Sequence, residues 1–146
     1  MRTLLAAALI LTTACAMTPD AQDAPAEPQM PAIQIQFLEI VTPEADATIE
    51  HLAALHGVTF SEPIAMLGNA RTARLTDGGM LSVRAPMHEM EDPTVRPYIL
   101  VDDVQAAADA AVAHGAELAM APTPLPGLGT FSIYILGGIQ HGVWQL

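Results

Sequence analysis

Basic side chains are scarce in this chain of 146 residues: it has five, and all of them are arginine. Sixteen acidic residues outnumber them, so the formal net charge is −11. The summed field of such a chain repels polyanions. This balance argues against a protein that binds the phosphate backbone of a nucleic acid.

Cysteine is also nearly absent, since Cys15 is the only one. A single cysteine excludes an intramolecular disulfide and a cysteine-rich zinc site. The apolar run at 4–11 is too short for a permanent transmembrane helix, which needs about 20 residues. Hydrophobic residues still make up 51% of the chain and charged residues 14%, which excludes disorder along its whole length. The length fits one domain.

Residues 1–16 have the layout of a secretory signal peptide, with Arg2, then the apolar run, then small residues. Two endings stay open. Cleavage after Ala16 fits the small residues on either side of Cys15. The alternative, which we favour, is a bacterial lipobox at 11–15 with Thr12 in place of its usual leucine, in which Cys15 carries a lipid that anchors the protein to a membrane. Both endings predict export to the bacterial cell envelope or periplasm.

Residues 17–32 are rich in Pro, Ala, Gln and acidic residues and show no periodicity. Such a segment buries too little apolar surface to fold, so we predict a disordered tether here. The folded domain is expected at 33–146.

Regular patterns begin at residue 33, where apolar and polar residues alternate to 41 as they do in a strand. Thr42, Pro43 and Glu44 then supply an N-cap, a proline for the first helical position and an acidic residue for the first turn. A helix is expected at 45–56, ended by Gly57. Turn signals frame short strands after it, including 71–75 and 80–84.

The same order returns in the second half. A strand at 97–101 is followed by a cap at Asp102-Asp103, a helix that ends at His114-Gly115, and strands at 118–121, 130–136 and 141–146. Two βαβββ modules, about 33–84 and 96–146, are the simplest interpretation. We predict an α+β fold: one domain whose eight-stranded sheet curls around a cleft, with one helix covering the outer face of each module.

Five segments of the sequence resemble those of the vicinal oxygen chelate superfamily, whose fold is shared by glyoxalases, bleomycin-resistance proteins and extradiol dioxygenases. They are Phe-Leu-Glu-Ile-Val-Thr-Pro-Glu at 37–44, Tyr-Ile-Leu-Val-Asp-Asp-Val-Gln-Ala-Ala-Ala-Asp at 98–109, His-Gly-Ala at 114–116, Leu-Pro-Gly-Leu-Gly-Thr-Phe at 125–131 and His-Gly-Val-Trp-Gln at 141–145. The resemblance covers about 35–146.

The resemblance implies where a divalent metal would bind in the metal-dependent members, which use His, Glu or Gln from four cleft-facing strands. Those positions fall on Phe37, Arg96, Gly142 and either Met80 or Ser82. None of these supplies a carboxylate, amide or imidazole ligand. We therefore predict no metal and no other cofactor. A separate acidic segment with a histidine, 88–92, lies between the modules and is interpreted as a solvated linker.

Strand parity predicts the side chains that face the cleft, and we take seven of them as ligand-binding: Phe37, Glu39, Ser82, Arg84, Arg96, Tyr98 and Trp144. Such an apolar set with a few polar groups is typical of a small-molecule site. Glu39, between Phe37 and Val41, has three possible roles: a general base, a partner for the ligand, or half of a structural ion pair with Arg84 or Arg96.

The function predicted from these residues is an exported glyoxalase-like protein that binds a small molecule in its cleft without the family's metal. The alternatives are a metal-dependent enzyme of the lyase or dioxygenase class with displaced ligands, and a non-catalytic envelope lipoprotein that binds other proteins. The family's known arrangements are also compatible with a homodimer.

Overall fold

The computed structural model describes residues 32–76 and 78–146. The predictions made for the signal peptide, for Cys15 and for nearly all of the tether fall outside these residues. Among the described residues, no helix is both long enough and apolar enough to cross a membrane.

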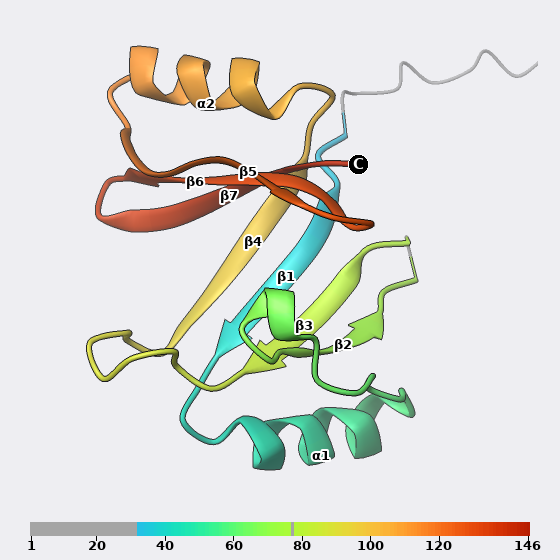
Figure 1. The fold of residues 1–146 in the computed structure, drawn as a ribbon. Coiled ribbons are helices and arrows are strands. Elements are labelled where there is room, and N and C mark those ends of the chain that lie inside the picture. The colour runs from blue at the N-terminus through green and yellow to red at the C-terminus, as the bar shows by residue number, and fades with distance from the viewer. Residues whose placement is uncertain (1–31, 77) are drawn as a thin grey trace, which may run out of the picture. The chain divides into compact units, whose positions relative to one another are not determined.

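The domain is α+β, as predicted, with two helices and one mixed sheet of seven strands (Figure 1). The strand order across the sheet is β2-β3-β1-β4-β7-β6-β5, so β2 and β5 are the outermost strands. In chain order, the elements are β1 (Ile35–Val41), α1 (Ala45–His56), a 3₁₀ turn (Ala65–Leu67), β2 (Arg71–Arg74), β3 (Met80–Arg84), β4 (Thr94–Leu100), α2 (Val104–Ala113), β5 (Glu117–Leu125), β6 (Gly129–Leu136) and β7 (Ile139–Gln145).

The antiparallel pair β1 and β4 forms the middle of the sheet, with Glu39 directly opposite Arg96. On its other side, each of these strands has a parallel neighbour, β3 beside β1 and β7 beside β4. Pro97 lies inside β4, although proline cannot donate to a sheet ladder. It is accommodated because pairing with β7 begins only at Tyr98.

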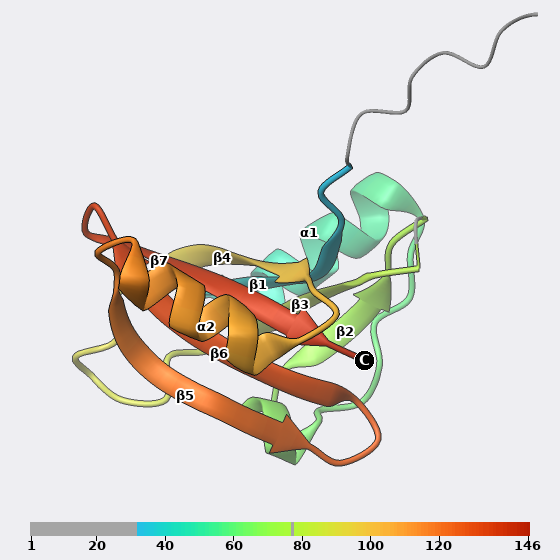
Figure 2. The ribbon, with the colours of Figure 1, turned by 90° about the horizontal axis from the view of Figure 1, so that it is seen from above.

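Each helix covers the outer face of one part of the sheet: α1 lies against β1 to β3, and α2 lies across β5 to β7 (Figures 1 and 2). Under α1, Ile49 packs with Phe60, Ala73 and Val83. The expected bounds of α1 are confirmed, and Gly57 ends it in the left-handed conformation. Its start differs, because Glu44 is the N-cap and the Thr42 hydroxyl instead accepts the Glu44 N–H in a preceding turn.

The inner face of the sheet carries a second core made of Phe37, Tyr98, Ile133 and Trp144. The Phe37 and Trp144 rings are stacked with centroids 4.9 Å apart, and the Tyr98 ring meets both edge-on. Aromatic pairs of this kind add to the stability that burial provides. This face is therefore firmly packed where it borders the cleft.

Eight strands were expected, and the described residues form seven. The difference lies between α1 and β2, where no strand forms. Ser61 donates its N–H to the carbonyl of Thr72, but its hydroxyl then takes the Thr72 N–H that a ladder would use. Pro63, two residues later, has no N–H to continue the pairing.

Candidate functional site

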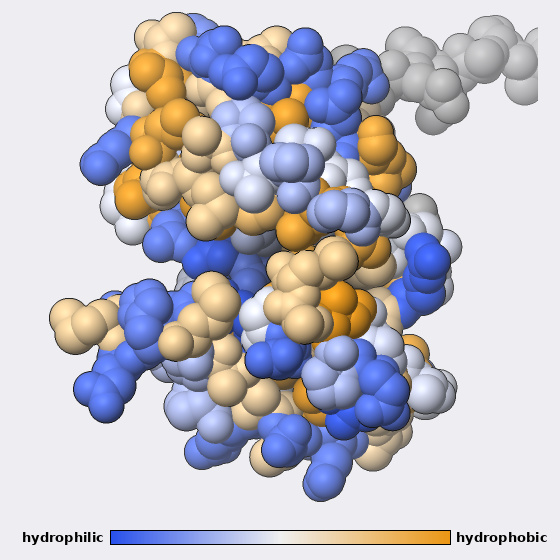
Figure 3. Space-filling model, in the orientation of Figure 1, coloured by the Kyte–Doolittle hydropathy of each residue, from blue (hydrophilic) through white to orange (hydrophobic). Residues whose placement is uncertain are grey.

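A cavity of about 470 Å³ opens on the inner face of the sheet, where the surface is hollowed in Figure 3. Its lining comes from β1, β3 to β7, the turn at 65–68 and the segment 85–93 that connects β3 to β4. The lining residues are Phe37, Glu39, Met66, Leu67, Gly68, Arg84, Met87, His88, Glu91, Arg96, Tyr98, Ala119, Met120, Thr123, Leu125, Phe131, Ile133, Gln140 and Trp144.

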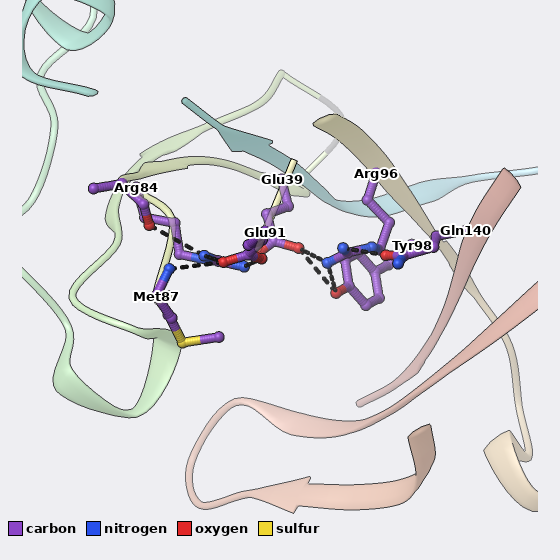
Figure 4. A network of polar contacts seen from close by, with 8 residues as sticks. Glu39, Arg84, Met87, Glu91, Arg96, Tyr98 and Gln140 are labelled. Atoms are coloured by element: carbon purple, nitrogen blue, oxygen red, sulfur yellow. Dashed lines mark hydrogen bonds and ion pairs between the residues drawn. The ribbon is translucent and has the colours of Figure 1, made fainter. Parts of the chain in front are cut away.

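Glu39 lies at the centre of the polar end of this cavity (Figure 4). Its Oε1 accepts a hydrogen bond from Nε of Arg84 at 2.7 Å. Its Oε2 accepts from Nη1 of Arg96 and, at 3.1 Å, from the hydroxyl of Tyr98. Sequence reasoning offered Arg84 or Arg96 as the partner of Glu39, and the structure pairs it with both.

Arg84 has a second carboxylate partner, Glu91, which reaches back from the connecting segment 85–93. The two Nη atoms of Arg84 donate to the two oxygens of Glu91 at 2.8 and 2.6 Å, and the Met87 N–H donates to Oε2 at 2.7 Å. These hydrogen bonds, first of all those from Arg84, lower the pKa of Glu91 to about 2. In turn, the hydrogen-bonded Glu91 carboxylate raises the pKa of Arg84.

Arg96 joins the cluster to the other half of the sheet, because its Nη2 donates to the side-chain oxygen of Gln140 on β7. Its Nε is buried and has no hydrogen-bond partner among the described residues. Nearby, burial raises the pKa of the Tyr98 hydroxyl above its usual value, and the negative charge of Glu39 adds to the effect. The tyrosine therefore stays protonated as a hydrogen-bond donor.

Six of the seven residues predicted to bind a ligand line this one cavity, all except Ser82. Ser82 is fully buried, between Thr72 and Glu39 in the sheet register, and its hydroxyl has no partner among the described residues. Sequence reasoning missed Gln140 and Glu91. Glu91 was interpreted as part of a solvated linker, and the structure corrects this, because its side chain is mostly buried against Arg84.

The positions that the resemblance assigned to a metal do not fit one. Phe37 belongs to the aromatic core and Arg96 carries a positive charge into the site. At Gly142, an added Cβ would lie 2.2 Å from Cδ1 of Tyr98, so no longer side chain fits there without displacing that ring. Across residues 32–76 and 78–146, no group of three His, Cys, Asp or Glu side chains is close enough to hold a metal ion.

Comparisons with known proteins give similarity at the level of structure only. No family model matches the sequence, and no curated protein is matched. A solved structure of a hypothetical protein from Bacillus halodurans is similar with a TM-score of 0.64 and 8% identity, over 80% of this chain and 96% of that one. A methylmalonyl-CoA epimerase from Streptomyces coelicolor, in complex with 2-nitronate-propionyl-CoA, has a TM-score of 0.57 and 17% identity over 76% and 95%. The methylmalonyl-CoA epimerase from Mycobacterium tuberculosis has a TM-score of 0.58 and 16% identity, over 76% of this chain and 86% of that one. At such identities, the similarity establishes the fold alone.

Proposed function

We propose that this chain, whose described residues have the fold of the vicinal oxygen chelate superfamily, binds a small molecule in its cleft without a metal ion. One observation carries the proposal. The cavity joins an apolar wall to a buried cluster of Glu39, Arg84, Arg96 and Glu91, and Arg96 of that cluster stands at one of the positions expected for a metal ligand.

The dimensions and the lining of the cavity support small-molecule binding. Ligand sites commonly have about 300–1,000 Å³ and combine mostly apolar walls with a few placed polar groups. Here the volume is about 470 Å³, with Phe37, Phe131 and Trp144 among the apolar residues. The buried arginines, together with Gln140 and Tyr98, supply the polar groups that orient a ligand.

Glu39 is better suited to an ion pair than to general base catalysis. A base must present a carboxylate oxygen to the substrate. Both oxygens of Glu39 already accept hydrogen bonds, from Arg84 on one side and from Arg96 and Tyr98 on the other. An enzyme of the lyase or dioxygenase class remains the alternative; if Glu39 is its base, Glu39→Gln abolishes its activity, and retained activity rejects that role.

The proposal extends to the arrangement and location of the protein. We interpret the two halves as two related modules that share the cleft. In the first module, the contacts of Ser61 with Thr72 stand where its outermost strand would pair with β2.

From the sequence of residues 1–16, we propose export to the cell envelope, with Cys15 as the lipidation site. The remaining alternative is an envelope lipoprotein that binds proteins, alone or as a homodimer, and leaves its cleft unused.

A ligand screen tests the function directly. Trp144 is the only tryptophan and lines the cavity, so its fluorescence reports on occupation. We would screen a fragment library together with a propionyl-CoA analogue, since the epimerase of similar fold was solved with one. We expect saturable binding in the presence of EDTA.

Two alanines on β5 provide matched variants for this screen. Ala119 is exposed and lines the cavity, whereas Ala121 is exposed and does not. Ala119→Phe should therefore block binding, and Ala121→Phe should not. A screen without hits, or hits that Ala119→Phe binds as well as the wild type does, would contradict the proposed function.

A further inference from the structure

We propose that the ligand of the cavity is a monocarboxylate with an apolar body, and that its carboxylate takes the place of Glu91 on Arg84. The inference rests on the proposed function and specifies the class of ligand. It starts from a contact that the chain makes with itself: the carboxylate of Glu91, from the connecting segment 85–93, already occupies Arg84, one of the two arginines that line the cavity.

Glu91 stands apart from its neighbours in the connecting segment 85–93. Glu89, Met90 and Asp92 are exposed, and Met90 is 86% accessible to solvent. Between residues 89 and 92, Glu91 alone is not exposed, and it meets the Arg84 guanidinium through two parallel N–H···O hydrogen bonds. Arginine binds carboxylates, including that of a ligand, in this bidentate geometry.

The two acidic residues of the cluster differ in how firmly they are placed. Glu39 extends from the central strand β1 and is held by Arg84, Arg96 and Tyr98. The Glu91 carboxylate also accepts three hydrogen bonds, two from Arg84 and one from the Met87 N–H, but Glu91 belongs to a connection rather than to a strand, and its own N–H donates to the carbonyl of His88 within that connection. Of the two carboxylates, Glu91 is therefore the one that a ligand displaces.

The charge of the cluster selects a monoanion. With Glu91 in place, two arginines face two carboxylates and the cluster is neutral. When Glu91 leaves, the cluster carries one positive charge, which a single carboxylate restores to zero. A phosphomonoester dianion would leave one negative charge in excess, and a neutral ligand would leave a buried cation without a partner.

A second observation also indicates an oxygen-bearing ligand. Nε of Arg96 is a buried donor without a partner among the described residues, and Arg96 lines the same cavity as Arg84. Buried donors are normally satisfied by protein groups or ordered water, and an oxygen of a bound ligand would satisfy this one in the same way. The apolar residues that border this polar end, among them Phe37, Leu125 and Phe131, fit the body of such a ligand.

Displacement of Glu91 has consequences for the connecting segment. Because its pKa is held near 2, Glu91 stays charged at neutral pH and competes with the ligand. Met87 and His88 line the cavity too, and the Met87 N–H is hydrogen-bonded to Glu91. A bound carboxylate would release that N–H to solvent.

The test compares 4-phenylbutyrate with its neutral analogue 4-phenylbutanamide, using Trp144 fluorescence of the full chain. In the wild type, we expect the carboxylate to bind at least about tenfold more tightly than the amide. Glu91→Gln removes the competitor, so it should tighten the carboxylate by a further factor of about ten and leave the amide unchanged. Glu89→Gln makes the same change of net charge at an exposed position and should alter neither affinity.

Hydrogen exchange provides a readout that does not need the variants to fold. In the wild type, saturation with 4-phenylbutyrate should speed exchange of the Met87 amide, and the amide analogue should not.

The outcomes separate this inference from the function beneath it. If fragments bind in the cavity while the carboxylate is no tighter than the amide, or while Met87 exchange stays slow, the inference is overturned and the proposed function stands. If no fragment and neither probe binds, both are overturned.

Discussion

Glu39 of β1 and Arg96 of β4 lie directly opposite each other across the central pair of strands, and the guanidinium donates from Nη1 to Oε2 of the carboxylate. Both side chains are more than nine-tenths buried. Two charges in such surroundings stabilise each other, whereas either one alone is costly. The pair therefore connects the two parts of the sheet at the polar end of the cavity.

Arg96→Ala should lower the free energy of unfolding by about 3–5 kcal/mol, because it takes from Glu39 one of its two cationic partners. In a double-mutant cycle with Glu39→Gln, the two substitutions should show a coupling of at least about 1 kcal/mol in urea denaturation. Glu50→Gln, on the exposed face of α1, is the matched control and should add to Arg96→Ala independently. Additivity of the Glu39 and Arg96 substitutions would reject the pair.

Acid should weaken the contact between Arg84 and Glu91. The pKa of Glu91 is about 2 in the folded chain against an ordinary 4.5, so its stabilising contribution is complete above pH 4.5 and is lost as the pH falls toward 2. The stability difference between the wild type and Glu91→Gln should shrink over that interval. Denaturation at several pH values measures it, with Glu89→Gln as the control; a difference independent of pH would contradict the ion pair.

Gly142→Ala should destabilise the protein although the backbone of Gly142 is not in the left-handed region. The added Cβ would meet the Tyr98 ring at 2.2 Å, and overpacking of this kind costs about 1–3 kcal/mol. A thermal melt measures the loss. Tyr98→Leu should relieve part of it in the double variant, and purely additive effects of the two substitutions would show that the ring is not the cause.

The helices and the cleft-facing strands followed from the sequence because their signals are local. Gly57 and Asp103 mark helix ends with particular backbone and side-chain requirements, and both act as expected. The number of strands did not follow. The segment before β2 does not pair as a strand because the Ser61 hydroxyl competes with the backbone for the Thr72 N–H and Pro63 has no N–H to continue the ladder, and the first of these contacts cannot be read from composition.

The candidate site was predictable only in part, for a related reason. Alternation along a strand assigns Glu39, Arg84 and Arg96 to one face, but it does not say which side chains are covered by others. Ser82 has the right parity, yet it is fully buried and does not line the cavity. Glu91 has no periodic context, and only the fold brings it to Arg84.

The N-terminal processing that we propose can be tested by intact-mass and peptide mass spectrometry of protein purified from its native membranes. We expect a mature chain that begins at a lipidated Cys15. Cys15→Ala is the matched variant and should move the protein from the membrane fraction to the soluble one. An unmodified mature N-terminus at Met17 would contradict lipidation and indicate cleavage after Ala16.

We propose that the cleft binds its ligand without a metal ion, because the ion-paired Arg96 and the aromatic ring of Phe37 occupy two of the positions expected for metal ligands. The most direct test is elemental mass spectrometry of the purified protein, before and after loading with Ni, Zn, Mn and Fe(II), with melting temperatures measured alongside. We predict no stoichiometric ion and no change in melting temperature after loading. A stoichiometric ion that raises the melting temperature would contradict the account and favour a metal-dependent enzyme.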